Sequence, residues 1–298
     1  MSDREQKSIL YKIIRIINSI VDNAMLLIFL FLLLVGGYSL WDTYTINSVA
    51  DQKEYQVYKP KKKDTRSFED FQTLNPDVIG WLNVYGTAID YPLLQGDNND
   101  MYLNTAPDGS FALSGSIYLD YRNSPKFDDF NSIIHGHHME KHKMFGDIGL
   151  FIDADYFDKH RYGSLYFNGT TYGIEFSNFI EVDAYDDMLY TPNFYDRNMY
   201  LNHIDSLSTQ KRDIGLNEKD QIVLLSTCAS MDTNGRHVLV GRLTDKVEKD
   251  PFANKHTKKI GLKAIFEDNN VLKYLLLSLV LLIFVIFVYK KKKREDVS

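Results

Sequence analysis

The sequence of 298 residues contains one cysteine, Cys228, so the chain cannot form an internal disulfide. It has no excess of positive charge either, because 40 acidic residues outnumber 34 basic ones and give a net charge of −6. A chain with this balance lacks the basic surface by which proteins hold nucleic acid. No internal repeat is present. These absences exclude a disulfide-stabilised scaffold, a repeat protein and a nucleic-acid-binding protein.

Two long apolar runs stand near the ends of the chain, at 24–41 and at 274–289. Each approaches the ~20 residues that cross a bilayer core. The alternative for the first run is a cleaved signal peptide, but the run is long for one and no small-residue cleavage site follows it. The alternative for the second is a buried core helix, but the basic run 290–294 follows it directly. We therefore expect two transmembrane helices.

Lysine and arginine set the expected orientation of these spans. Four basic residues, from Arg4 to Arg15, precede the first span, and five follow the second. Because cytoplasmic flanks carry the excess of Lys and Arg, both termini should be cytoplasmic and 42–273 should lie outside. Residues 8–20 form either an interfacial helix or a continuation of the span. An outer domain without disulfides fits the surface of a Gram-positive bacterium. The expected division is a cytoplasmic N-terminus at 1–23, a transmembrane helix at 24–41, an extracellular stalk at 42–66, a folded domain at 67–250, a linker at 251–273, a transmembrane helix at 274–289 and a cytoplasmic basic tail at 290–298.

The outer segment has the pattern of a folded β domain behind a polar stalk. Ser67 and Asp70 resemble a helix N-terminal cap, and the helix that they begin should stop near 75–77. Long amphipathic stretches at 142–161 and 193–213 favour two further helices. Many short strands with few helices predict a mainly β (α+β) fold, a closed barrel with peripheral helices. The predicted strands, which are β-branched or aromatic runs between turn residues, are 78–84, 88–94, 115–119, 132–134, 164–168, 171–184, 221–227 and 237–244.

Cys228 ends one of these strands and stands close to a cation in the sequence. It follows the apolar run 222–225, and after the polar loop 229–235 Arg236 opens the next apolar run. A lone cysteine is usually a small buried apolar residue. A thiol at the mouth of a strand beside a cation, however, is in a setting that favours a reactive thiolate. The pattern therefore makes Cys228 a candidate nucleophile.

A cluster of histidines, His135, His137 and His138, supplies candidates for the second titrating group that such a nucleophile needs. Together with His142 the cluster superficially resembles the metal-binding motif of metallo-β-lactamase-type hydrolases. The two residues after His138 are not the Asp and His of that motif, and no second set of ligands follows. We expect no metal and no cofactor, and a surface position for the isolated histidines.

The outer domain resembles a sortase, and among sortases it resembles class B. The resemblance depends on the order and spacing of several motifs together, because each motif alone is weak. These motifs are Asn75–Leu82, Asp90–Gln95, Asn98–Leu103, Gly115–Asn123, Gly136–Met139 with Met144–Phe145, and Leu225–Cys228.

The resemblance implies a sortase-type β-barrel and a cysteine transpeptidase. It assigns the nucleophile to Cys228, the acid–base role to His137 rather than to His135 or His138, and the binding of the substrate carbonyl or oxyanion to Arg236. In this family the cysteine attacks the carbonyl of a threonine in a sorting signal and forms a thioester. An amine then resolves the thioester and forms a new amide bond. The positions implied to contact the sorting peptide are Asn99, Leu103, Leu189, Tyr190 and Ser226.

The sequence departs from the class B pattern in ways that concern the substrate. Leu224 stands where the family usually has Thr, His135 stands where it usually has Tyr, and the loop from Cys228 to Arg236 is short. A second membrane anchor is common in the pilin-polymerising sortases of class C, but the stalk has no Asp-Pro-aromatic lid motif of the kind that class C enzymes carry.

The implied partners are a surface protein or pilin that bears a sorting signal, the lipid bilayer, and an acceptor amine on a peptidoglycan precursor or a pilin lysine. The second anchor favours pilin polymerisation, and the missing lid favours attachment to the cell wall. Two other functions stay open from the sequence. One is a hydrolase that transfers the acyl group to water, and the other is a non-catalytic, membrane-tethered binding protein on a sortase fold.

Overall fold

The computed structural model describes residues 3–61, 64–228 and 234–253. Their contacts separate most of a long N-terminal helix from a β-barrel unit that begins at Ile46. The second predicted span, at 274–289, and the basic tail after it lie outside the described residues, as does most of the predicted loop between Cys228 and Arg236.

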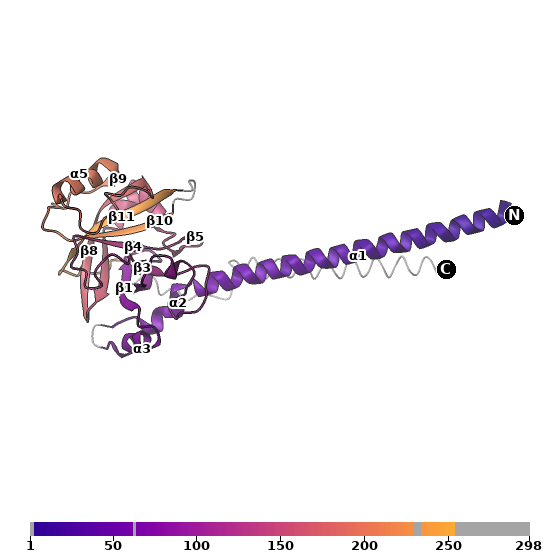
Figure 1. Cartoon of the computed structure of the whole chain (residues 1–298), viewed down its shortest axis with the longest axis horizontal. Coiled ribbons are helices and arrows are strands. Elements are labelled where there is room, and N and C mark those ends of the chain that lie inside the picture. Colours follow the sequence, from indigo (N-terminus) through magenta and orange to yellow (C-terminus); the bar gives the residue numbers. More distant parts are fainter. Residues whose placement is uncertain (1–2, 62–63, 229–233, 254–298) are drawn as a thin grey trace. The chain divides into compact units, whose positions relative to one another are not determined.

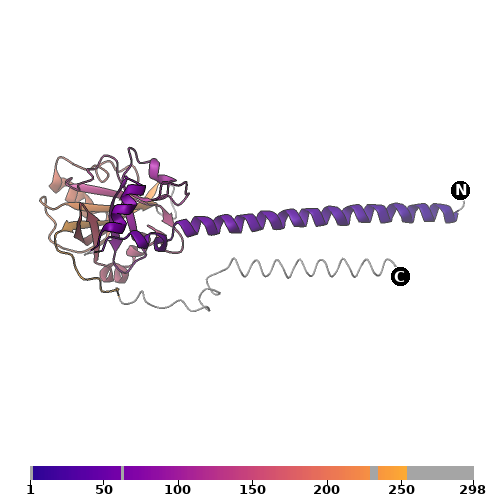
Figure 2. The same ribbon diagram turned by 90° about the horizontal axis from the view of Figure 1, so that it is seen from below.

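The N-terminal helix, α1 (Asp3–Val49), has the length and composition of a membrane span over Gln6–Val49. Its apolar side chains are exposed along most of its length, and Figure 1 and Figure 2 draw it as one unbroken helix. At about 1.5 Å per residue a helix of this length exceeds the thickness of a bilayer core. Because α1 is continuous from Asp3 to Val49, residues 8–20 belong to the same helix as the predicted span at 24–41.

The barrel is closed by a long antiparallel pair between the strands at its two edges. Within the described residues the strands of the main sheet follow the order β11-β10-β4-β3-β2-β1-β7-β8-β9, and β8 also pairs with β11, so that eight of them close into a barrel and β9 extends beyond it. The predicted closed barrel is confirmed. The strands of this sheet are β1 (Val78–Val84), β2 (Asp90–Leu94), β3 (Ile117–Leu119), β4 (Asn131–His135), β7 (Tyr162–Phe167), β8 (Thr170–Asp183), β9 (Ser208–Lys211), β10 (Ile222–Cys228) and β11 (Gly235–Thr244).

Short helices and one hairpin surround the barrel. The hairpin of β5 (His138–Met139) and β6 (Lys143–Met144) follows β4, and α5 lies beside β9 at one side of the barrel (Figure 1). The helices are α2 (Gln52–Tyr55), η1 (Gln56–Tyr58), α3 (Arg66–Leu74), η2 (Met101–Leu103), η3 (Ile148–Ile152), α4 (Ala154–Lys159) and α5 (Arg197–Leu207).

The strands bury side chains on both faces because the sheet has apolar layers inside and outside. Successive residues of a strand point to opposite faces, and in β10 this places Val223 and Leu225 in the aromatic-rich barrel interior. Ile222 and Leu224 instead pack in a second apolar layer with Tyr200 of α5. This double burial explains why the 222–225 run is continuously apolar.

Two predicted helices differ from the structure for identifiable reasons. The helix predicted at 142–161 is wrong: the segment holds β6, the 3-10 turn η3 and the six-residue helix α4. His142 and Met144 adopt left-handed φ angles of 58° and 49°, which interrupt a right-handed helix. The helix predicted at 193–213 is shorter than expected, because after α5 the chain turns extended at Ser208 and pairs with β8 as β9.

Candidate active site

Strand register brings the backbones of Cys228, Arg236 and the residue before His137 to one end of the barrel. Cys228 and Arg236 are directly paired where β10 meets β11. On its other edge β10 runs parallel to β4 and pairs Ser226 with His135. The chain leaving β4 stays beside β10, because the backbone N–H of Gly136 donates to the carbonyl of Ser226 at 3.2 Å. His137 follows immediately.

His137 is held through both its backbone and its ring. Its carbonyl accepts a hydrogen bond from the backbone N–H of Phe145 at 3.0 Å, which ties it to the end of the β5–β6 hairpin. Its ring Nε2 lies 2.8 Å from the carbonyl oxygen of Leu103. A carbonyl oxygen accepts only, so Nε2 carries a hydrogen in this contact, and in the neutral ring Nδ1 then holds the lone pair.

The carbonyl of Leu103 depends on a glycine in the same loop. Gly115 has a left-handed φ of 57°, and a Cβ built on it would come within 2.5 Å of the carbonyl oxygens of Leu103 and Tyr102. A larger residue at 115 would therefore displace the group that orients the His137 ring. Sequence reasoning missed this contact, because a backbone carbonyl has no residue signature.

The five residues predicted to contact a peptide occupy different environments. Tyr190 and Ser226 meet through their hydroxyl groups at 2.8 Å. Leu103 is partly buried against the barrel core. The side chain of Leu189 is fully buried in the layer under α5. The side-chain amide of Asn99 donates to Asp120 at 2.9 Å and accepts from the backbone N–H of Tyr121 at 3.0 Å.

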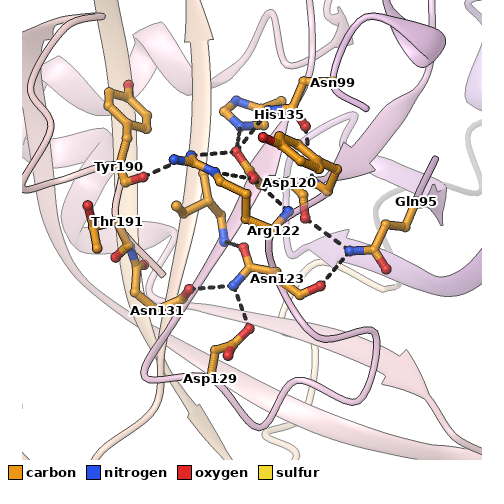
Figure 3. A network of polar contacts seen from close by, with 12 residues as sticks. Gln95, Asn99, Asp120, Arg122, Asn123, Asp129, Asn131, His135, Tyr190 and Thr191 are labelled. Atoms are coloured by element: carbon orange, nitrogen blue, oxygen red, sulfur yellow. Dashed lines mark hydrogen bonds and ion pairs between the residues drawn. The ribbon is translucent and has the colours of Figure 1, made fainter. Parts of the chain in front are cut away.

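Asp120, to which sequence reasoning gave no role, is the buried centre of a partly exposed polar network (Figure 3). Its side chain is 1% exposed and accepts two hydrogen bonds from the Arg122 guanidinium, at 2.8 and 2.9 Å. Asn99 donates to the same carboxylate, and the ring Nε2 of His135 lies 3.3 Å from it. Burial opposes ionisation, but these hydrogen bonds prevail and hold the pKa of Asp120 well below its usual range. The sequence signal that could have indicated this network is the pair Asp120 and Arg122, two residues apart directly after the strand β3.

His237, which follows Arg236 on β11, lies at the same end of the sheet. Burial lowers its pKa, and the neighbouring His138 acts in the same direction against the attraction of Glu181. No group of three His, Cys, Asp or Glu side chains suited to a metal ion occurs in the part of the chain that the structure describes.

Comparisons with known proteins identify several similar chains, although no family model matches this one. The Listeria monocytogenes sortase B is 36% identical over 183 residues, which are 59% of this chain and 74% of that protein. A crystal structure of sortase B from the Type II pilus of Streptococcus pneumoniae has 48% identity and a TM-score of 0.52, and the match covers 60% of this chain and 99% of that one. A Streptococcus pyogenes class B sortase involved in pilus biogenesis has 39% identity and a TM-score of 0.56, with 59% and 97% covered.

Proposed function

Because this chain belongs to the class B sortases, a family of cysteine transpeptidases, we propose that Cys228 is its nucleophile and that His137 and Arg236 complete the reaction centre. The strand register supports this proposal most directly. β10 lies between β11 and β4, so Cys228 is paired with Arg236 on one side and the chain entering His137 runs along the other. The chain entering His137, which is distant in the sequence from the β10–β11 hairpin, thus reaches the end of the barrel where Cys228 and Arg236 are paired.

The proposed reaction has two steps with the same proton carrier. The thiolate of Cys228 attacks the carbonyl carbon of a residue in the sorting signal, a C–S bond forms, and the C–N bond breaks as the leaving amine takes a proton from His137. In the second step an acceptor amine attacks the thioester, the new C–N bond forms, the thiolate leaves, and His137 takes the proton of the amine. Nδ1 is the working nitrogen, because Nε2–H is engaged by the carbonyl of Leu103.

Arg236 would stabilise the negative oxygen that forms in both steps. A guanidinium offers five N–H donors in a fixed plane, and one of them donates to the carbonyl of Gly235 at 3.0 Å. Charge-assisted donors directed at a developing oxyanion contribute strongly to catalysis. We propose that the sorting peptide binds along the predicted positions, which we call the proposed groove, and that the fully buried Leu189 supports this surface from behind without touching the peptide. The other residues of this groove are Asn99, Leu103, Tyr190 and Ser226.

The substrate programme that we favour is the joining of pilin subunits through a lysine. Two similar solved structures are described as pilus sortases, and the predicted second span at 274–289 points in the same direction. In this proposal α1 and the second span anchor the enzyme in the cell membrane, with both termini cytoplasmic and the barrel outside. Attachment of surface proteins to peptidoglycan is the competing programme, because the stalk lacks a lid motif.

Intact-mass analysis of the full chain in detergent micelles tests the proposal. The enzyme is incubated with a library of sorting-signal peptides and one of two amines, triglycine or a lysine-containing peptide. A thioester adduct that is absent in Cys228→Ala, followed by an amide product with the lysine peptide, is the expected result. Release of the free acid with either amine would identify a hydrolase. Failure of every peptide to form an adduct, while Cys228 still reacts with a small alkylating agent, would refute the proposed activity.

A further inference from the structure

Three segments that carry or adjoin positions predicted to contact the peptide are connected to one buried carboxylate, Asp120. The Asp120 carboxylate accepts hydrogen bonds from Asn99, in the loop before η2, and from Arg122, in its own loop, and it also contacts the ring of His135 at the end of β4 (Figure 3). Arg122 extends the connection, because its Nη2 also donates to the backbone carbonyl of Tyr190 at 2.9 Å. The carboxylate thus links the segments that carry Asn99, His135 and Tyr190.

Residues 184–191, here called the Tyr190 segment, continue this connection to β10, the strand that ends at Cys228. The hydroxyl of Tyr190 lies 2.8 Å from that of Ser226, and Ser226 precedes Cys228 by two residues on β10. The ring of Tyr190 also stacks near the ring of His135, with centroids 6.3 Å apart and an interplanar angle of 21°. A chain of direct contacts therefore runs from Asp120 to the strand that ends at Cys228.

The network has the features of a rigid support rather than of a reacting group. The Asp120 side chain is 1% exposed, so a peptide in the groove would not reach it. Nε and Nη2 of Arg122 each donate to the carboxylate, and the same Nη2 also donates to the Tyr190 carbonyl, so the planar guanidinium fixes the direction of all three hydrogen bonds. A fixed geometry of this kind lowers the ordering cost when a peptide binds.

We propose that Asp120 is a positioning residue that, through Arg122, holds the Tyr190 segment against β10 and so sets the affinity for the sorting peptide. The inference rests on the proposed function and deepens it. It predicts that breaking the connection weakens peptide binding, while the thiol of Cys228 keeps its reactivity. A purely structural role would instead lower stability and leave the Michaelis constant unchanged.

The test compares three variants of the full chain. Arg122→Met removes the tie to the Tyr190 carbonyl from a side chain that is 43% exposed, so the fold should survive. Asp120→Asn removes the central charge. Glu175→Gln is the matched control, because Glu175 is also a carboxylate held by arginines, Arg161 and Arg242, and its side chain is only 14% exposed. Arg242 stands six residues along β11 from Arg236, about 20 Å at roughly 3.3 Å per residue.

Five quantities are measured for each variant: KM for the sorting peptide, kcat, the rate of alkylation of Cys228 by a small reagent, the melting temperature, and amide hydrogen exchange over 184–191. Arg122→Met and Asp120→Asn should raise KM at least fivefold, change kcat and alkylation by less than twofold, and speed exchange in this segment. Glu175→Gln should lower the melting temperature without changing KM or this exchange.

An unchanged KM in Arg122→Met, with normal turnover by the parent, would overturn the inference and leave the proposed function intact. The inference also fails if exchange over 184–191 is unaffected, or if Glu175→Gln raises KM as much. Absence of turnover by the parent would refute the proposed function and this inference with it, and the exchange data would still show whether Arg122 holds the segment.

Discussion

The strongest test of how this chain presents His137 is the replacement of Asp147 by alanine. Asp147 lies three residues beyond the β5–β6 hairpin, and its side chain is 4% exposed. One carboxylate oxygen accepts from the backbone N–H of Ala88 at 2.7 Å, and the other lies 2.5 Å from Nδ1 of His142. The carboxylate therefore ties the hairpin that follows His137 to the loop between β1 and β2.

The two contacts should differ in their contribution to stability. His142 is 70% exposed, and a polar side-chain contact this open to water contributes about 0–1 kcal/mol. The bond to Ala88 is partly buried and ends on a carboxylate that is 4% exposed, and a hydrogen bond to a charged group contributes about 1.5–3 kcal/mol. Asp147→Ala should thus lower the free energy of unfolding by about 2–4 kcal/mol, and His142→Ala by at most about 1 kcal/mol.

Urea denaturation of both variants measures these differences, and peptide turnover measures their effect on the reaction. Because Asp147 supports the hairpin beside His137 and touches none of the proposed groove residues, kcat should fall several-fold while KM stays close to that of the parent. Equal losses of stability in Asp147→Ala and His142→Ala would place the energy in the exposed pair and refute the reasoning. A raised KM with an unchanged kcat would equally contradict the proposed link to His137.

Three further predictions concern single side chains of the barrel unit. Burial lowers the pKa of His237, so unfolding takes up a proton and stability is lost as the pH falls below about 6.5; His237→Asn should reduce the fall in melting temperature between pH 7 and pH 5. Gly115→Ala should lower both the melting temperature and kcat, because its Cβ would meet the carbonyl of Leu103 at 2.5 Å. Tyr200→Phe should cost about 1 kcal/mol in urea denaturation, because the buried Tyr200 hydroxyl donates to the carbonyl of Leu189 at 3.0 Å.

The local part of the proposed site could be predicted from the sequence because it depends on one hairpin. An apolar run, a short polar loop and a second apolar run predict two paired strands, and their pairing brings Cys228 and Arg236 together. The predicted strands of the barrel are likewise recognisable from alternation and turn residues. What the sequence did not reveal is the parallel pairing of β10 with β4, whose partners Ser226 and His135 are separated by 91 residues.

The contacts that orient the proposed site could not be predicted for a different reason. The ring of His137 is hydrogen-bonded to the backbone carbonyl of Leu103, and Arg122 donates to the backbone carbonyl of Tyr190. Backbone acceptors are present at every residue, so no residue pattern marks them. The segment 142–161 shows the same limit, because its composition favours a helix but the left-handed φ angles of His142 and Met144 interrupt one.

These contacts form two sets that can fail separately. The carbonyl of Leu103 and the hairpin tied by Asp147 act on His137, the proposed proton carrier. The network of Asp120 and Arg122 acts on the Tyr190 segment, which is part of the proposed groove. If the two sets are independent, substitutions in the first should lower kcat and substitutions in the second should raise KM. The double variant Asp147→Ala with Arg122→Met should then reduce kcat/KM by the product of the two single reductions. A double variant that is much less impaired than this product would mean that both sets support one shared element, and β4 with its continuation through His137 would be that element.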